Sequence, residues 1–479
     1  MKKINLFIGI FIMMMGFSSC DDWFDVSPKT DIKADDLFQD ENGFRDVLTG
    51  VYSLMTTTQT YGCQLTFGYT DVLAQYYNKI NNPSHQYYKT VSFNYNEPID
   101  ESTIANIWSV QYKAIANLNT FLHFAKTNQD AFNTETIRCI YTGEAYALRA
   151  FLHFDLLRLF GPVPETGMDQ KSIPYMEEFT NVAGPCLPAS EVLKKIVSDI
   201  ETARDLMRDF DSFGPNYDKL FKEYQSNKQL RNRSLHMNYY AATALLARVQ
   251  LYAGNKAEAL KAAQEIIGKA GSNPVRPFML ARRADVSDRL FVNELMFALQ
   301  IPDLEDVIDP YFGKQAYESG LTNSSKILAF GLKNRDNLFM AEHPSDDDFR
   351  LKLWFRETGS SDALMSGKLQ KQTMIPLIRV SELYYIASEC SEGEDAWEYL
   401  NKIRAHRGLA PLEDVEDEDL DFELYTEYCR EFMNEGQVFY YFKRKNMPQM
   451  GVYKSRRINP EKVYTLPMPV GELDYGNKN

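Results

Sequence analysis

The sequence predicts a mainly α-helical fold, in which helical hairpins are joined by long loops and β structure is minor. Apolar residues recur at the spacing of one helix face over several long segments, and Gly or Pro residues end many of these segments. The segments between them are rich in polar and aromatic residues and lack this period. The chain has 479 residues, of which 44% are hydrophobic and 25% are charged, so it can bury a large core.

The first twenty residues have the pattern of a secretion signal. Lys2 and Lys3 precede the apolar run of residues 4–17, which is too short to span a bilayer, and small residues then lead to Cys20. This pattern resembles a bacterial lipoprotein cleavage site and makes Cys20 the expected lipid attachment residue; ordinary cleavage that leaves a free thiol is the alternative. We therefore expect a signal peptide, a lipidated tether that anchors the protein to a membrane, and a single helical domain, over residues 1–19, 20–36 and 37–479, respectively.

The first half of the chain contains three long helical patterns and two irregular stretches. Periodicity begins near Leu37, and the expected long helices cover residues 101–126, 136–160 and about 190–210. The second of these ends at Gly161-Pro162, because Gly favours the end of a helix and Pro cannot continue one. We interpret the irregular stretches 61–100 and 161–186 as loops, and long structured loops often carry function.

Three pairs of helices are expected to form hairpins. Residues 234–270 form one around Gly254-Asn255, where Ala247 and Ala259 show the twelve-residue spacing of small residues typical of a tetratricopeptide repeat. The alternative is a generic helical bundle. The other two pairs lie within 379–407 and between 101–126 and 136–160. The stretches 271–378 and 408–421 are expected to be mainly loop, with short strands near 289–300 and 373–380.

Composition and motifs exclude several classes of function. Lys and Arg number 52 and Asp and Glu 66, which gives a net charge of −14 that disfavours binding to nucleic acid. The sequence contains no zinc-protease, Walker, dinucleotide-binding or serine-hydrolase motif, and its six His residues share no ligand spacing. We therefore expect neither an enzyme, a cofactor nor a metal, although a spatial pair of carboxylates, as in glycosidases, is not visible in a sequence.

Two aromatic loop segments are the candidate binding residues. Tyr rings present an apolar face and a polar tip, and sugar C–H faces stack on such rings while sugar hydroxyls bond to amides and carboxylates. The candidates from the first segment are Asp71, Tyr76, Tyr77, Asn78 and Tyr88. The candidates from the second segment are Tyr311 and Phe312. The alternative is that these side chains fill the protein's own core.

Five motifs in order resemble the SusD/RagB family of outer-membrane nutrient-binding lipoproteins. The most specific is the run GEAYALRAFLHFDLLRLFGPVP, which begins at Gly143 and ends at Pro164. The others are LPASEVLKKIVSDIETA, AATALLARVQLYAGNKAEALKAAQEII, the pair IRVSELYYIASEC and WEYLNKIRAHRG, and REFMNEGQVFYYFKR with the C-terminal LPMPVGELDYGN. The sequence departs from the family where Gln437 replaces an Arg and where Tyr440 or Tyr441 replaces an Asp.

The resemblance implies a single tetratricopeptide-like helical scaffold that is lipid-anchored at the cell surface in the outer membrane. It implies that the protein binds a glycan, or in some members a peptide, for a TonB-dependent transporter resembling SusC. It also implies that Glu144, Arg149, Asp155 and Arg158 form ion pairs between helices and do not bind the ligand. The competing hypotheses are a peptide-binding protein of the same type and a surface glycoside hydrolase.

Overall fold

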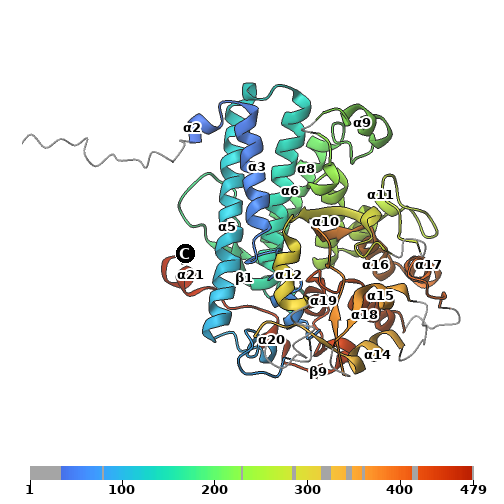
Figure 1. Cartoon of the computed structure of the whole chain (residues 1–479). Coiled ribbons are helices and arrows are strands. Elements are labelled where there is room, and N and C mark those ends of the chain that lie inside the picture. The colour runs from blue at the N-terminus through green and yellow to red at the C-terminus, as the bar shows by residue number, and fades with distance from the viewer. Residues whose placement is uncertain are drawn as a thin grey trace, which may run out of the picture.

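Helices dominate the computed structural model of the chain (Figure 1). It describes residues 34–77, 80–227, 230–282, 287–313, 325–340, 348–358, 362–412 and 419–476. The helices are α2 (Ala34–Leu37), α3 (Glu41–Met55), α4 (Tyr69–Leu73), α5 (Pro98–Thr127), α6 (Glu135–Phe160), α7 (Pro164–Gly167), α8 (Ala189–Met207), α9 (Tyr217–Tyr224), α10 (Tyr239–Tyr252), α11 (Lys256–Ile267), α12 (Leu304–Phe312), α14 (Leu332–Met340), α15 (Phe349–Trp354), α16 (Val380–Cys390), α17 (Gly393–Ala405), α18 (Leu420–Glu431), α19 (Gln437–Arg444), α20 (Pro460–Val463) and α21 (Val470–Tyr475). The mainly α prediction is confirmed.

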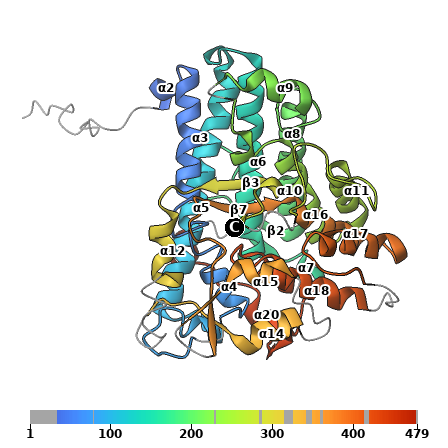
Figure 2. The same ribbon diagram turned by 45° about the vertical axis from the view of Figure 1, so that its right-hand side comes forward.

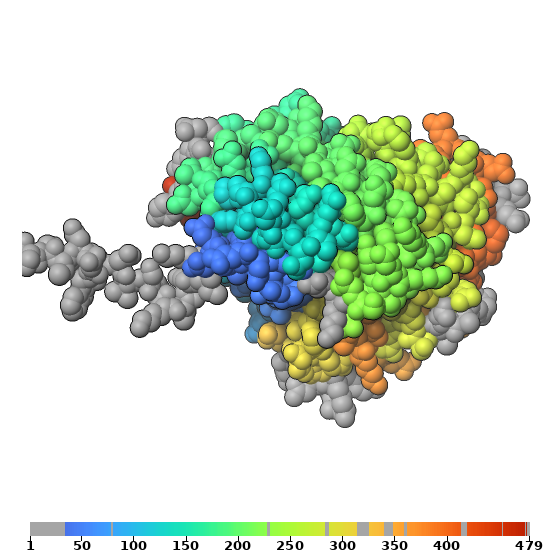
Figure 3. Space-filling view, turned by 90° about the horizontal axis from the view of Figure 1, so that it is seen from above, coloured from blue at the N-terminus to red at the C-terminus, as the bar shows by residue number. Residues whose placement is uncertain are grey.

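All three predicted hairpins are present, and they form a continuous stack. Helix α5 packs against α6, α10 against α11, and α16 against α17, while α8 joins α6 to α10 and α16 packs against α11 (Figure 2). Ala247 on α10 and Ala259 on α11 are fully buried, as the repeat spacing predicts. From above, α3, the ends of α5 and α6, and the segment from α8 to α9 form adjoining parts of one surface (Figure 3). Hairpins that each bury one face against a neighbour build a rigid frame.

Helix α6 is the central element of this frame. The side chain of its N-cap Thr134 accepts a hydrogen bond from the Ile137 N–H, and the helix ends at Gly161 before a proline. Gly143 lets α6 approach α8 closely, because a Cβ atom there would lie 2.6 Å from Met207 Cγ and 3.0 Å from the Ala203 carbonyl oxygen. From Gly143 onward nearly all residues of α6 are themselves buried, so other parts of the core pack against this helix on every side.

Short strands support the helical frame. The antiparallel pairs are β1 (Lys171–Pro174) with β2 (Cys186–Pro188), β3 (Leu295–Gln300) with β7 (Met374–Arg379), and β8 (Gln449–Met450) with β9 (Arg456–Arg457). A three-stranded sheet has the order β4 (Phe330–Gly331), β6 (Ala363–Ser366), β5 (Phe355–Glu357). The two predicted strands exist as β3 and β7, and they pair with each other. Three short helices that were not predicted, α12, α14 and α15, also form in the stretch 271–378, which the sequence predicts to be mainly loop.

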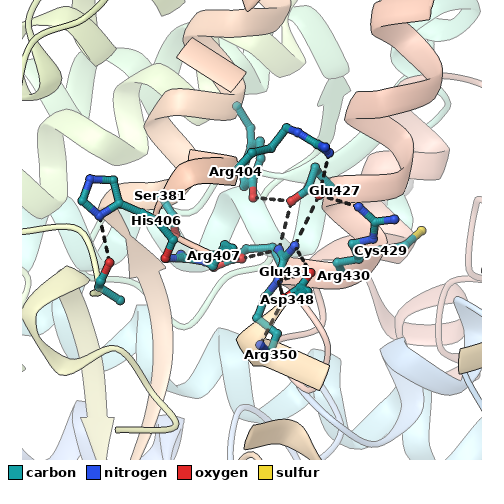
Figure 4. A network of polar contacts seen from close by, with 12 residues as sticks. Asp348, Arg350, Ser381, Arg404, His406, Arg407, Glu427, Cys429, Arg430 and Glu431 are labelled. Carbon is teal, nitrogen blue, oxygen red and sulfur yellow. Dashed lines mark hydrogen bonds and ion pairs between the residues drawn. The ribbon is translucent and has the colours of Figure 1, made fainter. Parts of the chain in front are cut away.

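A buried network of charges joins Glu294 to residues of the last third of the chain; part of it is shown in Figure 4. Arg350 pairs with Asp348, Glu427 and Glu431, at 2.8–2.9 Å, and Arg379 and Arg407 both pair with Glu431 and Glu294. The connected cations are Arg350, Lys368, Arg379, Arg404, Arg407 and Arg430, and the connected anions are Glu294, Asp348, Glu423, Glu427, Glu431 and Glu435. Six charges of each sign balance among the described residues, so the network fixes the position of α18 without leaving net buried charge.

Candidate ligand-binding site

The structure brings together the two aromatic segments that the sequence singles out. The ring of Phe67 lies 5.3 Å from that of Tyr311 and 5.6 Å from that of Phe312, and Tyr77 lies 6.2 Å from Phe312. Gln86 Nε2 also donates a hydrogen bond of 3.4 Å to Tyr311 Oη. Segments more than 200 residues apart in the chain therefore share one aromatic cluster between α4 and α12.

Most members of this cluster lie in the core, which corrects the expectation of an open stacking platform. Asp71, Tyr76, Tyr77, Tyr311 and Phe312 are all buried. The Tyr76 hydroxyl donates to the Cys429 carbonyl at 2.7 Å, the Tyr77 hydroxyl donates to the Phe67 carbonyl at 2.9 Å, and burial raises the pKa of the Asp71 carboxyl. The tyrosine rings are covered because Phe312 of α12 and Phe330 of β4 pack against them.

The remaining predicted residues are placed differently. Tyr88 is half-buried and keeps part of its ring open. Asn78 and Cys20 lie outside the described residues. Tyr88 therefore stays a candidate for ligand contact.

A groove of about 710 Å³ runs beside α5 between the β1–β2 loop and α21. Trp108, Tyr112, Ala116 and Thr120 line its floor and follow one another by four residues, so they form one stripe of about 18 Å along the helix. The rings of Trp108 and Tyr112 are 4.7 Å apart and tilted by 48°. Ala116 is exposed and small, and it leaves the floor hollow next to the two aromatic rings.

The opposite wall of this α5 groove belongs to the loop between β1 and β2. Phe179 in this loop is 53% exposed and leans on His123 of α5, with 5.1 Å between ring centroids. Polar groups are interleaved with the rings; the lining includes Thr120, Glu178, Thr180, Asn181 and Glu472. The site therefore combines open ring faces with hydrogen-bonding groups, which is the composition that ring-shaped polar ligands require.

A polar cluster behind the groove holds this loop in place. Arg149 on α6 donates two bonds of 2.7 Å to Asp199 on α8, one of 2.9 Å to Asn119 Oδ1 and one of 3.1 Å to the Glu177 carbonyl. Asn119 Nδ2 in turn donates to the Met176 carbonyl at 2.9 Å. The start of the loop is thus bonded to α5 directly and to α6 and α8 through buried side chains.

His153 completes the cluster as a neutral ring. The Met176 N–H donates to its Nε2 at 3.0 Å, so Nδ1 must carry the proton and donate to the Arg149 carbonyl at 3.0 Å. Burial disfavours the charged ring and Arg149 adds repulsion, and together they lower the pKa of His153 to about 3. The ring also stacks on Tyr175 at 3.9 Å. His153 is therefore a structural residue of the groove wall.

The four motif residues expected to form ion pairs between helices do form buried ion pairs, with one difference. Glu144 pairs with Arg233, and Arg149 pairs with Asp199. Asp155 and Arg158, however, pair with each other within α6.

The α5 groove is not apparent from the sequence. Trp108 and Tyr112 fall within the predicted helix of residues 101–126 and are not among the predicted binding residues, and the outer wall lies in the proline-rich loop of residues 161–186. An aromatic pair at four-residue spacing beside a loop with an exposed Phe179 is the available signal. It is weak, because the groove forms only when three distant segments meet.

Two further features bear on chemistry and location. Among the described residues, no group of three His, Cys, Asp or Glu side chains is placed to hold a metal ion, and the cysteines are free thiols. In the same part of the chain, no helix has both the length and the apolar character needed to cross a membrane.

The comparisons with known proteins agree with the fold. The SusD-like family described as "Starch-binding associating with outer membrane" matches residues 22–251, and the family described as "SusD family" matches residues 345–474. No curated protein matches the sequence.

Solved structures of 18–20% identity share the fold over most of both chains. A SusD superfamily protein from Bacteroides thetaiotaomicron is 20% identical over 90% of this chain and 97% of its own, with a TM-score of 0.70. A SusD-like carbohydrate binding protein from Bacteroides vulgatus is 18% identical, with coverage of 91% and 96% and a TM-score of 0.69. A SusD superfamily protein from Bacteroides fragilis is 20% identical, with coverage of 92% and 99% and a TM-score of 0.70.

The fold and the groove define a helical-repeat protein that presents an open aromatic groove on a rigid frame. The chain belongs to the SusD/RagB family.

Proposed function

We propose that the protein is a surface lipoprotein that binds an oligo- or polysaccharide and delivers it to a partner TonB-dependent transporter resembling SusC. The α5 groove is the proposed binding site. Its volume of about 710 Å³ lies within the range typical of ligand pockets. The starch-binding description of the matching family supports a glycan as the ligand, as does the similarity to a carbohydrate binding protein from Bacteroides vulgatus.

The observation that carries this proposal is the exposed ring of Phe179 over a floor that contains Tyr112 and Trp108. Phe179 is exposed, Tyr112 is half-buried and Trp108 is buried beneath them, so Phe179 and Tyr112 offer apolar faces to sugar C–H groups. The interleaved amide, hydroxyl and carboxylate groups offer partners to sugar hydroxyls. Binding of this kind needs no activated side chain, so the proposal includes no chemical step. Peptide capture is the alternative within the same class, and glycan hydrolysis is the alternative from a different class.

Filling the groove tests the site without disturbing the core. Ala116→Leu places a larger side chain on the exposed floor, and we expect glycan affinity to fall at least tenfold because the ligand loses its contact with the rings. Ala257→Leu on α11 is the matched control, because that alanine is also exposed on a helix but lies away from the groove. Equal loss in both variants, or no loss in Ala116→Leu, would remove the groove from the proposal.

Removing an exposed ring tests the stacking contact itself. Phe179→Ala should weaken glycan binding by about 1–3 kcal/mol, judged from stacking of planar rings on aromatic side chains. Phe221→Ala is the control, because Phe221 is also exposed and lines a separate hollow of about 500 Å³ beside α9. Tyr88→Ala tests the residue that the sequence predicts; a larger loss there than in Phe179→Ala would move the site to the α4 side of the molecule.

Two assays separate the classes of ligand and activity. Binding to a glycan array and to a peptide array should show saturable binding to glycans, and binding to peptides alone would favour the alternative of peptide capture. Release of shorter sugars during incubation with the bound glycan would replace the binding proposal with hydrolysis.

The membrane anchor and the partner are part of the same proposal. We propose that residues 1–19 are removed, that Cys20 is acylated, and that residues 20–36 tether the domain of residues 37–479 to the outer membrane at the cell surface. Labelling with an alkyne fatty acid should mark the wild-type protein and not Cys20→Ala. Co-purification of a TonB-dependent transporter from solubilised outer membranes tests the delivery step, and its absence would restrict the function to binding.

A further inference from the structure

The α5 groove carries charge of one sign. Among the described residues that line it, the charged side chains are the carboxylates of Glu178 and Glu472, and the others are aromatic, aliphatic or uncharged polar. Two cations behind the groove are engaged in ion pairs, since Lys195 Nζ lies 2.6 Å from Glu177 Oε1 and Arg149 is bound to Asp199. Burial and Glu472 raise the pKa of the Cys186 thiol and Lys171 of β1 lowers it, but Lys171 does not line the groove. The net charge of −14 adds a background of the same sign.

The two carboxylates belong to different walls. Glu178 precedes the exposed ring of Phe179 in the β1–β2 loop, and Glu472 comes from α21 on the other side. The charge of Glu472 also reaches the floor, where it contributes, after burial, to the raised pKa of Tyr112. A ligand seated on the rings of α5 therefore lies between two negative charges, which concentrate negative potential in the groove.

The hollow beside α9 has a different charge pattern from the groove. It also combines aromatic and polar residues, and the rings of Tyr217 and Phe221 stack there at 4.8 Å. Among the described residues lining that hollow, however, the charged side chain is Arg231. The surface thus offers hollows of opposite charge, and an anionic sugar has a better place to bind than the α5 groove.

We propose that the α5 groove selects glycans by charge: it binds amine-bearing sugars more tightly than neutral ones and rejects sugars that carry carboxylate or sulfate groups. This inference rests on the proposed function, because it names the substrate class of the same site. A unit charge held at roughly 6 Å from a carboxylate in water changes affinity about threefold at low ionic strength. Two carboxylates together give about a tenfold preference for an amine over a neutral hydroxyl, and a similar penalty for an acid group.

The test compares oligosaccharides of equal length that differ in charge. Glucosamine oligomers, cello-oligosaccharides and oligogalacturonates supply the cationic, neutral and anionic ligands, and calorimetry measures their affinities at low salt and at about 0.5 M salt. We expect glucosamine to bind about tenfold more tightly than the neutral sugar and galacturonate to bind about tenfold more weakly. Salt should reduce both differences, because it screens exposed charges.

Two variants connect this ranking to the groove. The double variant Glu178→Gln/Glu472→Gln should keep neutral binding and lose the preference for glucosamine. Glu201→Gln on the exposed side of α8 is the control and should keep the preference.

Each outcome separates this inference from the proposed function. The three sugars could bind with equal affinity, and Ala116→Leu could abolish that binding. This result would overturn the charge selection and leave the proposed function standing. Equal or tighter binding of galacturonate, or a preference that survives the double variant, would also overturn it. The failure of all three sugars to bind would overturn the charge selection and the capture of these glycans together.

Discussion

Replacing Arg149 with Met should destabilise the fold by about 3–5 kcal/mol, because it leaves a buried carboxylate without its cation. The side chains of Arg149 and Asp199 are 5% and 9% exposed, and two N–O distances of 2.7 Å join them. In the variant, Asp199 loses both bonds from Arg149 and keeps the hydrogen bond that the Tyr175 hydroxyl donates to it. Asn119 Oδ1 and the Glu177 carbonyl each lose the donor that Arg149 supplied. Urea denaturation followed by circular dichroism measures the loss in the free energy of unfolding.

A double-mutant cycle and a surface control test the reasoning. Arg149→Met/Asp199→Leu removes both charges and should recover most of the stability, since apolar side chains of similar volume can replace a buried pair. Lys195→Met breaks the exposed pair with Glu177 in the same region and should cost less than about 1 kcal/mol. A cost below about 1 kcal/mol for Arg149→Met, or a double variant as unstable as the sum of the singles, would refute the account of this cluster.

Three further perturbations should affect other parts of the frame. Gly436→Ala should cost more than about 3 kcal/mol in urea denaturation, because φ is +70° there and the new Cβ would lie 2.1 Å from the Leu65 carbonyl oxygen; a loss below about 1 kcal/mol would contradict this. His153 has a pKa of about 3 in the folded chain against 6.5 ordinarily, so the unfolded chain binds more protons between these values and stability falls as pH drops through that window. The His153 contribution is about 2 kcal/mol between pH 8 and pH 5, and an unchanged pH slope in His153→Gln would disprove it. Arg350→Met leaves the buried carboxylate of Asp348 without its cation and removes one of several cations from Glu427 and Glu431. It should cost about 3–5 kcal/mol or prevent soluble expression, whereas near-native stability would show that Arg350 is not required by the charge network.

The α10–α11 hairpin and the β3–β7 pair show how far local patterns reach. The spacing of Ala247 and Ala259 predicted a close helix pair, and both residues are fully buried where α10 meets α11. Likewise, the strands expected near residues 289–300 and 373–380 formed, because a short apolar run between turn residues is a local property. Their pairing with each other was not predictable, since nothing in either run specifies its partner.

The aromatic residues show where such reasoning stops. Composition could not separate Tyr77, whose ring is covered by Phe312 and whose hydroxyl bonds to the backbone, from Phe179, whose ring is open. Lys443 gives a further example: its charge is typical of the surface, yet it is buried and donates to the Gly161 carbonyl at 2.6 Å. The residues that bury Tyr77 and Lys443 are far from them in the sequence, so burial could not be predicted from neighbouring residues.

The sequence by itself determined the helical class and the hairpins, because periodicity and caps are encoded by neighbouring residues. The export signal stays a prediction from the apolar N-terminal run. Only the tertiary structure decided which rings are covered, how the buried charges pair and where a groove remains open. Burial depends on which surfaces meet after the hairpins stack, and α5, the β1–β2 loop and α21 meet only in three dimensions.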